Sequence, residues 1–150
     1  MEFWTSSWWR SARKPHVIRI VLDSAAVLAM IQGEPGGERV ETLLDALEPG
    51  ADVQVSISSV NWCEILTRMQ RDNRAVTAED LTAVLAGIEL VPFDKEAAEL
   101  AAGYARVSQA LSLGDRACLA LAKANHATAW TADRVWVQFK LDVPVELIRN

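Results

Sequence analysis

The sequence predicts an α/β fold in which helices cover both faces of a mostly parallel sheet. The first observation behind this prediction is that short segments rich in β-branched residues alternate with longer, amphipathic segments along the chain. The second is size: the chain has 150 residues, 51% of them hydrophobic, which is enough for one domain with a substantial core. The third is the absence of an internal repeat, which argues against a solenoid.

The first part of the chain predicts one strand and two helices. VIRIVL (17–22) is short and β-branched, which is typical of a buried strand. The helix expected over 24–32 is preceded by Asp23, a good capping residue, and is broken by GEPGG. A second helix is expected over 38–49, because its valine and leucines recur at helical spacing.

The middle of the chain predicts a second strand, two helices and a third strand. VQVSIS (53–58) is the strand, and 59–73 has a helical stripe of apolar residues. Thr77 can cap a helix that extends to about residue 85. IELVPF (88–93) predicts a strand that ends at its proline.

The last part of the chain predicts two long helices and two short strands. A helix over 94–111 begins with acidic residues, as the helix dipole favours. It is followed by a very apolar helix at 114–125 and a short strand at 127–131. ADRVWVQF (132–139) predicts a short helix, and VPVELI (143–148) predicts the last strand.

Composition narrows the possible functions and compartments. The net charge of −5 does not favour a nucleic-acid binder, because phosphate contacts need Lys and Arg, and it permits a basic partner. Cys63 and Cys118 match no zinc or redox spacing, and we expect both to be small buried residues in a cytoplasmic protein.

The first sixteen residues differ from the rest. They include three of the six tryptophans and several basic residues. We expect an N-terminal extension over 1–16, either frayed or added by an upstream start codon, and a single domain over 17–150. The extension has no apolar run long enough for a signal peptide or a membrane span.

Two aspartates come just after predicted strands. Asp23 follows the first strand and Asp133 the fourth, and in parallel α/β folds ligands bind at the carboxyl ends of strands. Each is explained equally well as a helix cap, which stabilises by about 1 kcal/mol.

Glu64 shares a helix face with Asn61, Arg68 and Arg71. On spacing alone, a surface pair with Arg68 worth about 0.3–0.5 kcal/mol is its better explanation.

Asp115 is harder to explain as a structural residue, because it begins a helix that is apolar on most faces. The helix dipole stabilises it by about 0.3–1 kcal/mol, which does not offset the several kcal/mol of desolvating a carboxylate. We therefore expect Asp115 to reach solvent at a cleft or to be neutralised by a cation. Ser112 is expected to cap the helix and leave Asp115 free.

Together these acids predict a metal site at one edge of the sheet. Two carboxylates about 4 Å apart repel by roughly 4 kcal/mol at an effective dielectric near 20, so four of them need a cation. Oxygen ligands suit Mg²⁺ or Mn²⁺, and such an ion can activate a water while it binds a phosphate oxygen. An acidic cluster with a divalent metal is therefore a phosphodiester-cleaving site.

Four stretches in order resemble PIN-domain ribonucleases and, within them, the VapC-type toxins of bacterial type II toxin–antitoxin pairs. They are VLDSAAVLAMIQGEPG (21–36), SSVNWCEIL (58–66), LSLGDRACLALA (111–122) and TADRVW (131–136). The resemblance implies a Rossmann-like α/β/α sandwich and endonucleolytic cleavage of tRNA or other structured RNA with Mg²⁺ or Mn²⁺. It also implies a small antitoxin partner, a homodimer, and a heterotetramer or larger assembly with the antitoxin.

The resemblance also implies roles for particular residues. Asp23, Glu64, Asp115 and Asp133 fall on the acidic metal-binding quartet of the family, with Ser24 and Thr131 as supporting hydroxyls. The candidates for binding RNA are the arginines near these acids, whereas Arg74 is expected to be a solvated surface residue. These candidates are Arg68, Arg71, Arg116 and Arg134.

Two alternatives stay open. A non-catalytic module could use the same fold to bind a partner, because fold does not imply function. A phospho-receiver domain also places an aspartate after a strand, but it needs an acidic pair there and a lysine after the last strand. This sequence has Asp23-Ser24 and only Arg149 at those places.

Overall fold

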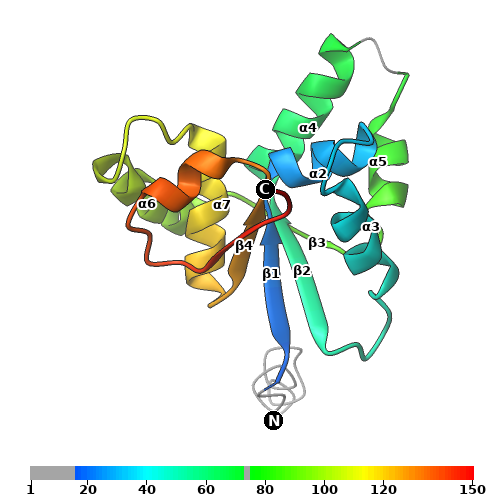
Figure 1. Cartoon of the computed structure of the whole chain (residues 1–150), viewed down its shortest axis with the longest axis horizontal. Coiled ribbons are helices and arrows are strands. Elements are labelled where there is room, and N and C mark those ends of the chain that lie inside the picture. Colours follow the sequence, from blue (N-terminus) through cyan, green and yellow to red (C-terminus); the bar gives the residue numbers. More distant parts are fainter. Residues whose placement is uncertain (1–15, 73–74) are drawn as a thin grey trace.

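The computed structural model describes residues 16–72 and 75–150, and these form a five-stranded sheet between two layers of helices (Figure 1). The strand order is β3-β2-β1-β4-β5, and all four strand pairings are parallel. The strands are β1 (Ile18–Leu22), β2 (Val53–Ser58), β3 (Glu89–Val91), β4 (Thr128–Thr131) and β5 (Val145–Leu147). The predicted α/β fold with a parallel sheet is confirmed.

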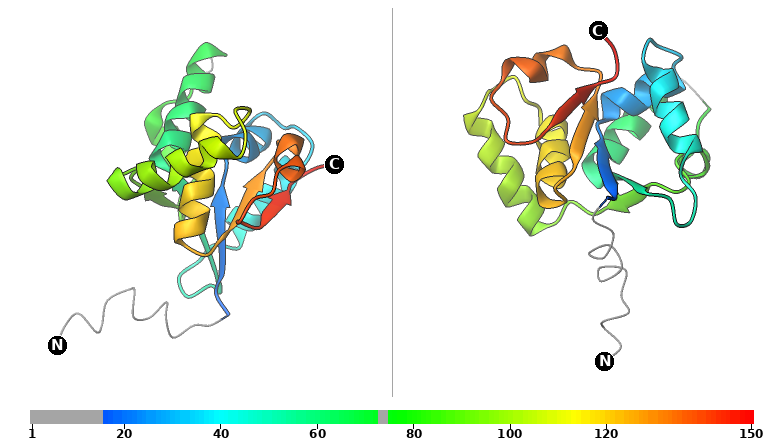
Figure 2. Two further views of the ribbon diagram at one scale, coloured as in Figure 1. Left: turned by 90° about the vertical axis from the view of Figure 1, so that its left-hand side faces the viewer. Right: turned by 60° about the horizontal axis from the view of Figure 1, so that its bottom comes forward.

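Each face of the sheet packs against its own group of helices (Figures 1 and 2). One layer consists of α2 (Ser24–Ile31), α3 (Gly37–Asp45), α4 (Ser59–Arg71) and α5 (Ala78–Val84). The other contains α6 (Lys95–Gly103), α7 (Leu113–Ala124) and the 3₁₀ turns η2 (Tyr104–Arg106) and η3 (Arg134–Gln138). In β1, Ile20 and Leu22 face the first core and Val21 the second, as the two-residue repeat of a strand requires.

The helix predicted over 94–111 is shorter in the structure. Regular α-helix ends at Gly103, and the chain tightens into the turn η2. Glycine is a poor helix former, and the next residue, Tyr104, turns into the second core, where its hydroxyl donates to Asp142 Oδ1 at 2.5 Å. The apolar spacing predicted a longer helix because the turn η2 also places an apolar side chain in the core.

The predicted burial of both cysteines is wrong for Cys63, which is exposed, and right for Cys118. The buried face of α4 is formed by Asn61, Ile65 and Met69, spaced four residues apart. Cys63 is two residues from Asn61, and successive helical residues turn by about 100°, so it lies on the opposite side of the helix.

No helix in the described parts of the chain is long and apolar enough to cross a membrane. The predicted extension lies outside the described residues except for His16, and Arg74 lies outside them as well. The boundaries proposed from the sequence, 1–16 and 17–150, stay predictions.

Candidate active site

Asp23 is positioned by the end of β1 and is 2% exposed. It has the backbone conformation of an N-cap before α2, but its side chain makes no capping hydrogen bond. Instead, Thr131 Oγ1 donates to Asp23 Oδ2 at 2.8 Å, and Asn61 Nδ2 lies 3.5 Å from Asp23 Oδ1. The explanation of Asp23 as a simple side-chain cap is therefore wrong, because its carboxylate points into a cluster of polar groups.

Glu64 extends from α4 toward the same cluster. Its Oε1 accepts hydrogen bonds from Ser24 Oγ at 2.8 Å and from Asn61 Nδ2 at 3.0 Å. Arg68, the expected surface partner of Glu64, lies instead 3.5 Å from Asp72, measured from Nε to Oδ2. The predicted surface pair between Glu64 and Arg68 is therefore wrong, and two polar side chains hold the Glu64 carboxylate instead.

Asp115 and Ser112 form a reciprocal capping box at the start of α7. The Ser112 backbone N–H donates to Asp115 Oδ2 at 2.9 Å, and the Asp115 N–H donates to Ser112 Oγ at 3.2 Å. Ser112 caps the helix as expected, but the expectation that it leaves Asp115 free is wrong. One oxygen of this half-buried carboxylate is engaged with the backbone.

Thr131 connects two of the acids. While its hydroxyl donates to Asp23, its Oγ1 accepts the backbone N–H of Asp133 at 3.0 Å. The Asp133 Oδ1 accepts the N–H of Val135 at 3.0 Å and so caps η3. Asp133 is therefore a helix cap, as one of the two sequence-based explanations held, and it also lies beside the cluster.

Asn61 and Gly114 belong to the cluster although the sequence did not single them out. Asn61 is fully buried, and its Nδ2 also donates to the Gly114 carbonyl at 3.1 Å, while its Oδ1 is buried without a partner among the described residues. A Cβ on Gly114 would lie 2.1 Å from Glu64 Oε1. The four-residue spacing of Asn61 from Ile65 on the buried stripe could have predicted that this amide is buried.

The four acids are electrostatically linked. Burial raises the pKa of Asp23 to about 7 against the lowering effect of the Thr131 hydrogen bond, and the charges of Asp115 and Glu64 raise it further. Burial also raises the pKa of Asp115, with contributions from Asp133 and Glu64. Among the described residues, no three His, Cys, Asp or Glu side chains form a ready ligand set for a metal ion. The structure brings the acids close without arranging them as a closed cage.

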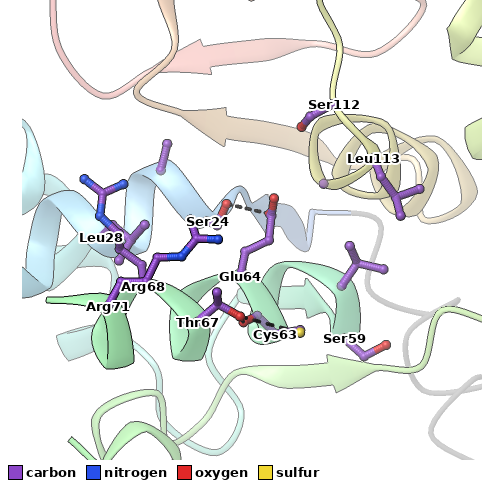
Figure 3. A pocket seen from close by; sticks show the side chains of 13 residues that line it. Ser24, Leu28, Ser59, Cys63, Glu64, Thr67, Arg68, Arg71, Ser112 and Leu113 are labelled. Atoms are coloured by element: carbon purple, nitrogen blue, oxygen red, sulfur yellow. Dashed lines mark hydrogen bonds between the residues drawn. The ribbon is translucent and has the colours of Figure 1, made fainter. Parts of the chain in front are cut away.

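A cavity of about 830 Å³ opens beside Glu64, between α2, α4 and the start of α7 (Figure 3). Ser24 and Glu64 line it together with Arg68 and Arg71. The other two arginine candidates do not line this cavity. Arg116 is half-buried on α7, and Arg134 is exposed next to Asp133.

The fold and the site define an α/β domain with an acidic centre at the carboxyl ends of β1 and β4. The model of the PIN domain family matches residues 20–140, and the chain belongs to this family. That membership excludes the phospho-receiver alternative.

Solved structures support the fold independently. The chain is similar to VapBC2 from Rickettsia felis, with 16% identity, coverage of 87% of this chain and 98% of the other, and a TM-score of 0.63. VapBC from Salmonella typhimurium has 16% identity, the same coverages and a TM-score of 0.59. FitAcB from Neisseria gonorrhoeae has 22% identity, coverages of 84% and 95%, and a TM-score of 0.55. No curated protein matches the chain.

Proposed function

We propose that this protein is a metal-dependent endoribonuclease and the toxin of a type II toxin–antitoxin pair. The observation that carries the proposal is the burial of Asp23 beside further acids: burial raises the pKa of Asp23 to about 7, and the charges of Asp115 and Glu64 contribute to this rise. A buried carboxylate of this kind is unfavourable for stability, and such groups cluster at functional sites. Membership of the PIN domain family and the likeness to toxin–antitoxin structures support the same proposal.

The residues present fit a hard divalent cation, Mg²⁺ or Mn²⁺. The donors are carboxylate oxygens, and the mutual repulsion of Asp23, Asp115 and Glu64 is what a cation would relieve. Mg²⁺ keeps several waters and needs only one or two carboxylates, so a closed cage of protein ligands is not required. In this proposal Asp23 and Asp115 are the direct ligands, and Asp133 completes the site.

The chain's own residues would then prepare the hydrolysis. A bound divalent ion supplies a lowered pKa for a coordinated water and charge neutralisation at the phosphodiester. Glu64, fixed by Ser24 and Asn61, either binds the ion or orients the attacking water. Thr131 fixes Asp23 and, through the backbone N–H of Asp133, the position of the fourth acid.

RNA cleavage by the purified chain tests this proposal. With Mg²⁺ or Mn²⁺ the protein should cut tRNA or another structured RNA, and EDTA should stop the reaction. Asp115→Asn should reduce cleavage by at least about a hundredfold, while its amide oxygen can still accept the Ser112 N–H. Glu96→Gln, an acid in the first turn of α6, is the matched control and should cut normally. Equal cleavage by the Asp115 variant and the native protein would refute the site.

The same experiment addresses the binding-module alternative. A protein that neither cuts RNA nor binds Mg²⁺ or Mn²⁺ in calorimetry would be a non-catalytic PIN-like module. The proposed partner is a small antitoxin: one similar structure is described as a toxin–antitoxin complex and another as a member of the VapBC family of toxin–antitoxin systems. A short upstream reading frame for a DNA-binding protein, whose product copurifies with this chain, is the expected observation. We also propose a cytoplasmic homodimer that forms a heterotetramer or larger complex with the antitoxin.

A further inference from the structure

The cavity beside Glu64 has an acidic end and a basic end. Glu64, Arg68 and Arg71 occupy positions i, i+4 and i+7 of α4, so they share one face of the helix. At 1.5 Å per residue, the two arginines lie about 6 Å and about 10.5 Å from Glu64 along the helix axis. Figure 3 shows both arginines projecting from α4 on the same side as Glu64, toward α2.

These arginines are available to a ligand. Among the described residues, Arg68 forms an ion pair only with Asp72, at 3.5 Å, and its side chain is 53% exposed. Arg71 is exposed and forms no ion pair with any residue that the structure describes. By contrast, Arg39 and Lys123 each pair with an acid at 2.8 Å or less. The two arginines that line the cavity are therefore less compensated by neighbouring acids than Arg39 and Lys123.

The walls between the two ends are apolar. Leu28 of α2 and Val60 of α4 line the cavity, and Leu113 forms part of the opposite wall. Leu113 is the first residue of α7, directly before the buried Gly114, and it is 51% exposed. An exposed leucine beside a site for phosphate chemistry offers a surface against which a nucleobase can pack.

We propose that an unpaired stretch of RNA lies along this cavity, with phosphates on one side of the scissile bond bound by Arg68 and Arg71. A base next to the scissile phosphate packs against Leu113. Grooves that bind single-stranded nucleic acids combine positive charges, which contact the phosphate backbone, with surfaces against which the bases pack. This cavity has both features. The proposal rests on the ribonuclease function proposed above and selects two of the four arginine candidates as the RNA-binding pair.

An RNA-binding assay in EDTA tests the proposal without cleavage. Fluorescence anisotropy measures how tightly the full chain binds a labelled single-stranded RNA of mixed sequence at several salt concentrations. Arg71→Ala should weaken binding several-fold and reduce the slope of log K against log salt by about 0.7, the value for one phosphate contact on a single strand. Arg106→Ala, an exposed arginine in η2 outside the cavity, should bind like the native protein.

Leu113→Ala provides a second variant that leaves the charges unchanged. It should weaken binding several-fold without changing the salt slope. Leu90→Ala, the same substitution at a leucine that is 44% exposed and outside the cavity, should have no effect. Both substitutions are on the surface, so folding is expected to be preserved.

The outcomes separate this proposal from the proposed function. If the native protein cuts RNA with Mg²⁺ or Mn²⁺ but neither Arg71→Ala nor Leu113→Ala alters binding, the path along the cavity is wrong and the ribonuclease function stands. The cavity would then be better assigned to a protein segment. If RNA does not bind even at low salt, this proposal is overturned. If the native protein binds RNA through Arg71 but does not cut it with either metal, the function fails and the binding surface stands.

Discussion

At the scale of single residues, the candidate site depends on how closely Glu64 approaches the backbone of α7. Asn61 Nδ2 donates both to Glu64 Oε1 and to the Gly114 carbonyl, so one amide holds a side chain of α4 against the first turn of α7. The carboxylate occupies the space that a Cβ on residue 114 would need. Glycine is required at this position because of the neighbouring carboxylate, not because of a turn.

Gly114→Ala should therefore disturb the site more than the fold. A methyl group would lie 2.1 Å from Glu64 Oε1, so the flexible Glu64 side chain must move away and lose its hydrogen bonds with Ser24 and Asn61. RNA cleavage with Mg²⁺ or Mn²⁺ should fall by at least about tenfold, because a small misplacement of a catalytic group is enough to cost that much.

The matched control is Gly103→Ala in α6, where a Cβ would meet no atom within 4 Å. This variant should keep full cleavage activity and gain about 0.5–1 kcal/mol in free energy of unfolding, the usual gain for alanine over glycine in a helix. Urea denaturation and an RNA cleavage assay measure both quantities. Unchanged cleavage by Gly114→Ala would show that Glu64 is not required in its present position.

At the scale of the elements, α7 combines an apolar body with an acidic first turn. Its residues from Ala117 to Ala122 are all buried, so the helix is fixed against the sheet. The capping box then holds Asp115 at the helix end, next to Glu64 and Asp133. The element thus positions a carboxylate rigidly, which is what a metal site needs.

Ser112→Ala should show that this cap has two consequences. It should lower the free energy of unfolding by about 1 kcal/mol, because the Asp115 backbone N–H loses the Ser112 hydroxyl. It should also lower RNA cleavage, because the first turn that positions the Asp115 carboxylate is then held only by the backbone N–H of residue 112. Thr77→Ala removes the other capping box, at the exposed start of α5, and should cost similar stability with no loss of cleavage. Urea melts and cleavage rates are the measurements, and equal cleavage by the two variants would contradict the role of the cap.

At the scale of the whole molecule, the parallel sheet brings together residues that are far apart in the chain. Asp23 follows β1, Thr131 ends β4, and Glu64 and Asp115 come from the helices on opposite faces. The carboxyl ends of parallel strands meet at one edge, which is where ligands bind in such folds. The resulting concentration of negative charge makes the global stability of the metal-free protein depend on pH.

Comparison of the native protein with Asp23→Asn in EDTA should reveal this dependence. The pKa of Asp23 is about 7 in the folded protein and about 3.9 when unfolded, so its contribution is fully present below about pH 4 and is lost as the pH rises through 7. Between pH 4.5 and 8, the unfolding free energy of the native protein should fall relative to the variant by roughly 3 kcal/mol.

Urea denaturation at several pH values measures this difference. The raised pKa of Asp115 acts in the same direction in both proteins and largely cancels in the comparison. Parallel stability curves for the two proteins would show that Asp23 is not destabilised by its surroundings.

Addition of Mn²⁺ should restore stability to the native protein more than to Asp23→Asn, because a ligand that binds only the folded state stabilises it.

The spacing of apolar residues was sufficient to predict most elements, with errors mainly at their ends. The stripe that includes Ile65 and Met69 correctly predicted the buried face of α4, whereas the helix expected through 111 ends at Gly103. Apolar spacing reports which side chains reach the core and not the backbone geometry that takes them there. Tyr104 is buried from a 3₁₀ turn as effectively as from an α-helix.

The parallel α/β fold could be predicted from the sequence, because the alternation of strand and helix patterns is local information. The sequence also singled out Asp115, since an acid at the head of an apolar helix is conspicuous without any structure. The three-dimensional fold was needed to show that Asp23 is not a side-chain cap and that Glu64 is not part of a surface ion pair. Their hydrogen-bond partners, Thr131 and Ser24, lie 108 and 40 residues away, and no local pattern reports contacts at such separations.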